Sequence, residues 1–143
     1  GDALVPEPDH AAFPSLLGDD QIFIRSYSRY LVVAEKFEAM VSLGEVNSRM
    51  KDYFDVWLLE QSFKFNSNTL REAITHTFAR RGTAVPTKRP VGLSEKFHED
   101  AAKQRQWASF LERAGITNDP PSLREVCDRI WALADDLVGH QEG

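Results

Sequence analysis

Five charged residues of the types that handle phosphates lie within a short stretch of the sequence. Lys36 lies in a predicted helix, close to its apolar stripe, and Arg49, Lys51, Asp52 and Asp55 crowd the start of the next predicted helix. Asp52 and Asp55 are three residues apart, so they project from one face of that helix. An antiparallel arrangement of the two helices would bring Lys36 close to Asp52.

Phosphoryl and nucleotidyl transfer need cations that bind the phosphates and carboxylates that hold Mg²⁺ or orient the nucleophile. Lys36 is a candidate ligand for a triphosphate, Arg49 is a candidate to assist it, and Asp52 is a candidate orienting group or base. The alternative is a surface ion pair, which typically contributes about 0–1 kcal/mol. Residue types and spacing alone favour the ion pair, so the catalytic interpretation needs further support.

A second group of charges occupies residues 71–89, where five basic residues stand against one acid, Glu72, in a chain of net charge −5. The basic residues are Arg71, Arg80, Arg81, Lys88 and Arg89. One interpretation is a contact with an RNA backbone, which would make binding sensitive to salt. The other is a solvated helix end, since the helix dipole favours cations in the last turn. The sequence leaves the two interpretations open.

The elements that position these charges follow from the spacing of the apolar residues. Apolar side chains recur at three- and four-residue intervals in five segments, which predicts five amphipathic helices. The predicted helices cover about 30–43, 47–62, 69–81, 100–114 and 122–138. Glycines follow three of them, at Gly44, Gly82 and Gly115, and glycine is the usual residue just beyond a helix end.

Capping residues and turn residues complete the predicted fold. Thr69 and Ser122 each precede a glutamate by three residues, which is the spacing of a capping box. Residues 1–20 are rich in proline and acidic residues and are expected to form a loop, whereas 21–25 are expected to form a short strand. Residues 83–94 are expected to form an extended connection. The expected fold is therefore mainly α, an irregular bundle of about five helices with one or two short N-terminal strands.

The composition bounds the class of protein. The chain has 143 residues, of which 42% are hydrophobic, so it fits one domain with a substantial core. A net charge of −5 argues against a protein coated in positive charge, although a local basic patch is compatible with nucleic-acid binding. The single cysteine, Cys127, allows no internal disulfide and suits the cytoplasm. Neither a membrane span nor a signal peptide is predicted.

The remaining reactive side chains do not predict a metal or nucleophilic site. The four histidines lack the spacing of metal ligands. Cys127 and the tryptophans Trp57, Trp107 and Trp131 fall on apolar helix faces and are expected in the core. The predicted chemistry therefore rests on the charges of the first two helices.

Longer strings around these charges resemble a known family. The strings are AEKFEAMV at 34–41, NSRMKDYFDVWLL at 47–59, TLREAITHTFARRGTAVP at 69–86 and AAKQRQWASFL at 101–111, together with the opening GDALVPEP. They resemble the AbiEii/AbiGii toxin nucleotidyltransferases, and the resemblance covers nearly the whole chain. Its most specific pieces are the A-E-K and R-x-K-D-x-x-D strings.

The resemblance implies a fold and an activity. Family members are similar in having a polymerase-β-like core followed by a helical half, and they use Mg²⁺ to move a nucleoside monophosphate from an NTP to an RNA acceptor, tRNA in characterised relatives. The family's functional lysine falls on Lys36, and its later functional aspartate falls on Asp52, with Asp55 as second choice. Arg49 and Lys51 are the implied nucleotide-binding cations. The implied partners are an NTP, RNA and a cognate antitoxin in the cytoplasm, and no membrane.

One departure limits what the resemblance implies. The family's metal site begins with a G-S-x-x-x-D motif, and the chain contains no Gly-Ser pair. We therefore expect that residues 1–28 continue from a missing catalytic core, that 29–143 form a helical C-terminal domain, and that the chain alone neither holds Mg²⁺ nor catalyses transfer. The alternative is a non-catalytic helical module that binds an antitoxin or a separate catalytic subunit. An inactive helical remnant is a third, weaker interpretation.

Overall fold

The computed structural model describes residues 19–142, and the side-chain environments of 27–135. Six α-helices and two short 3-10 helices make up this part of the chain, and it contains no strand. In chain order they are α1 (Asp19–Leu43), η2 (Gly44–Val46), α2 (Met50–Ser62), α3 (Ser67–Arg81), η3 (Val91–Leu93), α4 (Glu95–His98), α5 (Ala101–Ala114) and α6 (Leu123–Glu142). The expected mainly α fold is confirmed.

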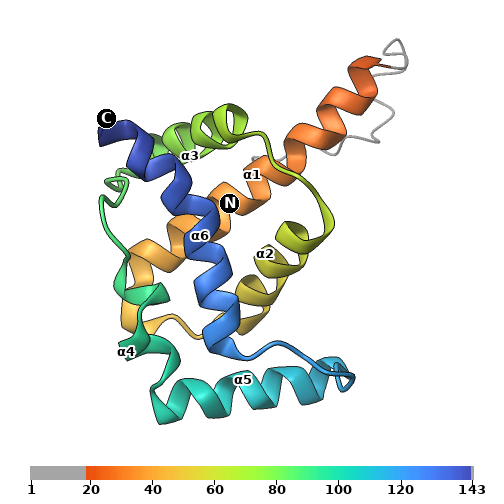
Figure 1. Ribbon diagram of the computed structural model, residues 1–143, viewed down its shortest axis with the longest axis vertical. Coiled ribbons are helices and arrows are strands. Elements are labelled where there is room, and N and C mark those ends of the chain that lie inside the picture. Colours follow the sequence, from red (N-terminus) through yellow and green to blue (C-terminus); the bar gives the residue numbers. More distant parts are fainter. Residues whose placement is uncertain (1–18, 143) are drawn as a thin grey trace.

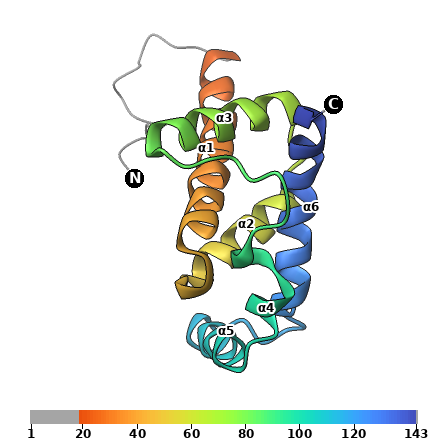
Figure 2. The ribbon, with the colours of Figure 1, turned by 90° about the vertical axis from the view of Figure 1, so that its left-hand side faces the viewer.

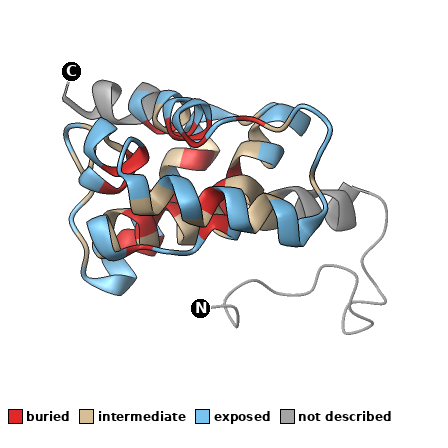
Figure 3. Ribbon diagram, turned by 90° about the horizontal axis from the view of Figure 1, so that it is seen from below, coloured by how far each residue is buried: buried red, intermediate tan, exposed pale blue. Residues whose placement is uncertain are grey.

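The helices surround one core. The long helix α1 packs chiefly on α3, and α2 packs chiefly on α6. Helix α5 lies across one end of the molecule, at the bottom of Figure 1, and is seen nearly end-on in Figure 2. Buried segments gather inside this arrangement while exposed ones face outward (Figure 3). Large buried side chains of the core include Phe37, Tyr53, Phe78 and Phe97.

The N-terminal prediction was partly wrong. Residues 21–25, expected to form a strand, and residues 19–28, assigned to loop or strand, belong to α1. Their apolar residues alternate over too short a stretch to distinguish a strand from the start of a helix. The loop and any strand predicted among residues 1–18 lie outside the described residues.

The other helix boundaries depend on local caps. Gly82 and Gly115 both have φ of 72° and end α3 and α5 as expected. Ser122 caps α6, because its Oγ accepts a hydrogen bond of 3.0 Å from the Glu125 amide. The cap expected at Thr69 was wrong: Asn66 caps α3 by accepting from the Thr69 amide at 3.0 Å. Asparagine is as good a cap as serine or threonine, so α3 begins at Ser67.

The connection between α3 and α5 does more than link two helices. Its Gly92 and Leu93 are buried, and the carbonyl of Gly92 accepts a 2.7 Å hydrogen bond from the Tyr53 hydroxyl. A Cβ atom at Gly92 would stand 2.3 Å from the Met40 carbonyl oxygen, so only glycine fits there. The expected extended connection, residues 83–94, thus closes the core through η3 near its end. The four-residue α4 that follows it was not predicted.

The buried single cysteine is confirmed as a core residue. Cys127 has no exposed surface, and burial raises the pKa of its thiol to about 12. Trp107 is also buried, and its indole N–H donates to the Pro121 carbonyl at 3.0 Å. Trp57 and Trp131 are partly buried against the core. None of the helices in the described part of the chain combines the length and apolar character needed to cross a bilayer.

Candidate functional site

The predicted approach of Lys36 to the acidic residues of α2 is confirmed. The Lys36 ammonium donates to Asp52 Oδ1 at 2.7 Å, and it lies 3.7 Å from Asp55 Oδ2. Since Asp52 and Asp55 are one helical turn apart, both carboxylates face α1 from the same side of α2. The three side chains are 25%, 19% and 26% exposed, so they are half-buried at the α1–α2 boundary.

The turn between α1 and α2 sets this geometry. Gly44 has φ of 55°, which starts the turn directly after α1. Asn47 is buried; its Oδ1 accepts from the Arg49 amide at 2.8 Å, and its carbonyl accepts from the Lys103 ammonium at 2.7 Å. These bonds hold the entry to α2 against α5. The first turn of α2, which carries Asp52, is therefore held between the turn that follows α1 and helix α5.

Lys51 completes a charge cluster on the exposed side. Its ammonium lies 2.8 Å from Asp55 Oδ2, and its side chain is 75% exposed. The hydrogen bond to Asp55, helped by the negative charge of that carboxylate, raises the pKa of Lys51 above its ordinary value. Two ammonium groups and two carboxylates thus alternate in what we call the lysine–aspartate cluster: Lys36, Lys51, Asp52 and Asp55. At neutral pH the charges of its four members balance.

A groove adjoins this cluster between the start of α2 and α5. We call it the α2–α5 groove; it has a volume of about 680 Å³. Its lining residues are Ser48, Arg49, Met50, Lys51, Ala102, Arg105, Gln106, Ser109, Phe110 and Arg113. Four of these are cations and none is an acid. Lys51 belongs to both the groove and the cluster, so the two features are continuous.

Sequence reasoning included Arg49 and Lys51 but missed Arg105 and Arg113. Their spacing in the sequence was a usable signal. Arg105, Ser109 and Arg113 follow one another at four-residue intervals, so they lie on one face of a helix. Both arginines are distant in the sequence from Arg49 and Lys51, and no local pattern links them to the start of α2. Their common groove is a consequence of tertiary packing.

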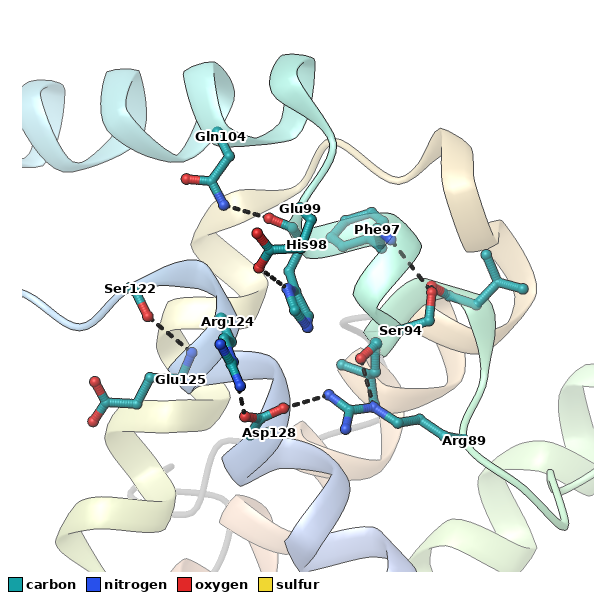
Figure 4. Close-up of polar contacts among 12 residues, drawn as sticks. Arg89, Ser94, Phe97, His98, Glu99, Gln104, Ser122, Arg124, Glu125 and Asp128 are labelled. Carbon is teal, nitrogen blue, oxygen red and sulfur yellow. Dashed lines mark hydrogen bonds and ion pairs between the residues drawn. The ribbon is translucent and has the colours of Figure 1, made fainter.

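The basic residues of 71–89 lie differently, because most of them are already engaged. Arg80 and Arg81 both bind the Glu35 carboxylate, the second at 2.7 Å. Arg89 donates to the Leu93 carbonyl at 2.7 Å and to Asp128 at 2.7 Å (Figure 4).

The last two basic residues of this segment differ from each other. Arg71 donates to Asn68 at 3.1 Å. Lys88 is exposed and has no ion pair within the described part of the chain. The structure therefore leaves Lys88 without an ion pair in the described part of the chain, distributes the four arginines over three side-chain partners, and does not gather the five basic residues at one site.

The carboxylates do not form a magnesium site by themselves. Both Asp52 and Asp55 are bound by ammonium groups, which neutralise the charge that a divalent cation would need. Among the described residues, no group of three or more His, Cys, Asp and Glu side chains could hold a metal ion. His98 is buried and its Nδ1 pairs with the Glu99 carboxylate at 2.7 Å (Figure 4). In the described part of the chain, the Asp52 and Asp55 carboxylates are thus paired with ammonium groups and do not belong to a larger set of metal ligands.

Comparison with known proteins agrees with the resemblance seen in the sequence. No curated protein and no solved structure matches the chain. One family model, described as "Nucleotidyl transferase AbiEii toxin, Type IV TA system", matches residues 1–129. This range contains the lysine–aspartate cluster, the α2–α5 groove and all five basic residues of 71–89. The chain therefore belongs to the AbiEii nucleotidyltransferase toxin family of type IV toxin–antitoxin systems.

Proposed function

We propose that this chain supplies the helical half of a nucleotide and RNA site in a toxin that transfers a nucleoside monophosphate from an NTP to an RNA acceptor of the tRNA class. Membership of the AbiEii family supports a nucleotidyltransferase. The observation that carries the site is the 2.7 Å contact between the Lys36 ammonium and Asp52, two residue types that such a transfer requires, at a half-buried helix boundary.

Lys36, Asp52 and Asp55 of the cluster, together with the neighbouring Arg49, have roles in this proposal. The Lys36 ammonium binds the triphosphate, and the exposed Arg49 guanidinium adds a second cation at the start of α2. Asp52 orients the attacking hydroxyl of the acceptor and accepts its proton, as the acceptor oxygen bonds to the α-phosphorus and pyrophosphate leaves. Asp55 holds Lys36 and Lys51 in place, because it lies within 4 Å of both ammonium groups.

The metal belongs to another part of the toxin in this proposal. Mg²⁺ neutralises phosphate charge when it is bound, but the described residues lack a ligand set for it. We therefore expect the chain alone to bind nucleotide weakly and to be inactive in transfer. Incubation with labelled NTP, Mg²⁺ and total tRNA tests this expectation, and robust labelling by the chain alone would contradict it.

Nucleotide binding is tested by an NMR titration, because chemical shifts detect weak complexes. Addition of ATP, GTP, CTP and UTP in turn is expected to shift amides around Lys36 and 49–55 with at least one of them. Lys36→Met is expected to weaken that binding about tenfold, equivalent to ~1.4 kcal/mol. Glu35→Gln is the matched control, since Glu35 precedes Lys36 in α1 but binds arginines of α3.

Two outcomes of the titration would count against the nucleotide site. One is the absence of shifts around Lys36 with every NTP. The other is equal weakening by Lys36→Met and Glu35→Gln, which would indicate a general effect on the fold. Either result would favour the alternative, a helical module that binds a protein partner.

A further inference from the structure

The arginines with described side chains divide into those with partners and those without. Ten arginines have described side chains. Seven of these contact an acid, an amide or an aromatic ring: Arg29, Arg71, Arg80, Arg81, Arg89, Arg124 and Arg129. The other three are Arg49, Arg105 and Arg113, for which the described part of the chain provides no such partner. All three line the α2–α5 groove.

This concentration is unexpected for the charge of the molecule. The net charge is −5, and carboxylates elsewhere in the described part of the chain pair with five of the ten described arginines. In the α2–α5 groove, Lys51 is neutralised by Asp55, but no acid lines the groove to neutralise the three arginines. Three uncompensated charges in one concave surface create a local positive potential that attracts an anion.

The geometry of α5 indicates an extended anion with several charges. Arg105 and Arg113 are eight residues apart, which places them about 12 Å apart along the helix axis. Arg49 directly precedes α2, which packs on α5, and lines the same groove (the two helices are labelled in Figures 1 and 2). A single phosphate does not span this distance, whereas a chain of repeated phosphates meets all three. Guanidinium groups also bind phosphate oxygens in pairs, which lysine cannot do.

We propose that the α2–α5 groove binds the phosphate backbone of RNA, and that Arg49, Arg105 and Arg113 are its contacts. The choice of RNA over an acidic peptide rests on the proposed function, because a nucleotidyl acceptor brings repeated phosphates to the start of α2. Lys51 lies at the junction, so RNA in the groove passes beside the lysine–aspartate cluster. The surface differs from the 71–89 segment, where Arg80, Arg81 and Arg89 are held by acids of the chain itself.

The test compares two double variants in a salt titration. Binding of a fluorescein-labelled oligouridylate is measured by anisotropy for the wild-type chain, for Arg105→Gln with Arg113→Gln, and for Arg80→Gln with Arg81→Gln. The groove variant is expected to bind at least tenfold more weakly. It is also expected to lower the slope of log K against log salt by about 1.4, since each phosphate contact on a single strand contributes ~0.7.

The control pair distinguishes binding of RNA in the α2–α5 groove from a general effect of positive charge. Arg80→Gln with Arg81→Gln removes the same two charges but keeps amide donors for Glu35, and it is expected to change the affinity less than twofold. Circular dichroism establishes that each variant is folded. Equal losses in the two variants, or no loss in the groove variant, would overturn the proposal. So would competition by polyglutamate as strong as that by unlabelled RNA, because it would point to an acidic protein.

This experiment is independent of the nucleotide site. Lys36→Met leaves the three groove arginines in place and is expected to leave RNA binding intact. Loss of NTP binding in Lys36→Met with retained RNA binding would support both proposals. RNA binding without any NTP binding would support only the proposal for the α2–α5 groove. NTP binding without RNA binding would contradict the proposal for the groove and leave that for the nucleotide site in place.

Discussion

Adjacent residues of α1, Glu35 and Lys36, enter two charge clusters of opposite composition. Glu35 turns toward α3 and binds the guanidinium groups of Arg80 and Arg81. Lys36 turns toward α2 and lies within 4 Å of the carboxylates of Asp52 and Asp55. In each cluster one charge of α1 is held by two opposite charges of a neighbouring helix.

The likeness of the two clusters shows that ion pairing alone does not identify a functional site. Both clusters fasten α1 to a partner helix, and both central side chains are mostly buried, at 15% exposed for Glu35 and 25% for Lys36. They differ in what lies beyond them. The lysine–aspartate cluster continues through Lys51 into a groove with unpaired arginines, whereas the arginines at Glu35 are occupied by that carboxylate.

Reversal of the two central charges gives the largest expected effect. Lys36→Glu places three carboxylates together, and Glu35→Lys places three cations together. Each is expected to lower the free energy of unfolding by about 2 kcal/mol, between the values for exposed and buried pairs. Urea unfolding followed by circular dichroism measures this loss. A loss of stability in only one of the two variants would show that the two clusters are not equivalent, and that the cluster of the other variant does not hold α1 in solution.

Much of the fold was predictable because it depends on local signals. The glycines after α3 and α5, and Ser122 before α6, act within a few residues of the chain. The error at 21–25 arose because a few apolar residues fit a strand and a helix equally well. Helix α4, with four residues, is shorter than one clear period of an apolar stripe. Its position depends on the tertiary packing of Phe97.

The candidate site was predictable in part for the same reason. Lys36 and Asp52 stand out through a local string of residues, and a short turn leaves their helices few arrangements. Prediction of the α2–α5 groove from the sequence would have required knowledge of which arginines lack partners. That property depends on long-range pairs such as Arg81 with Glu35 and Arg89 with Asp128, which the sequence does not display.

Removal of the two arginines that hold Glu35 gives an intermediate effect. Arg80→Ala with Arg81→Ala leaves a carboxylate that is 15% exposed without a charged partner. The expected loss is about 1–2 kcal/mol in the free energy of unfolding, because a mostly buried acceptor loses its hydrogen bonds. The glutamine double variant is expected to lose less, since its amides still donate. An equal loss in the alanine and glutamine variants would show that charge, and not hydrogen bonding, holds this helix pair.

Substitution of Lys51 has the smallest expected effect. It tests whether this exposed fourth member of the lysine–aspartate cluster contributes less to stability than the other three. Its side chain is 75% exposed and pairs with Asp55 one turn away, so Lys51→Met is expected to cost at most about 0.5 kcal/mol at pH 7. The hydrogen bond to Asp55 raises the pKa of Lys51 above 10.5 in the folded state. The stabilisation is therefore complete below pH 10.5 and is lost as the pH rises through the higher folded-state value.

Urea unfolding of the wild-type chain and Lys51→Met at pH 7 and at pH 11 and above measures this dependence, because other titrating groups cancel in the difference. The difference is expected to shrink at the higher pH. A difference that stayed constant would mean that Lys51 stabilises α2 through its aliphatic stem, and not through Asp55. In that case Lys36 alone would neutralise Asp55, and the link between the cluster and the α2–α5 groove would be one of proximity and not of shared charge.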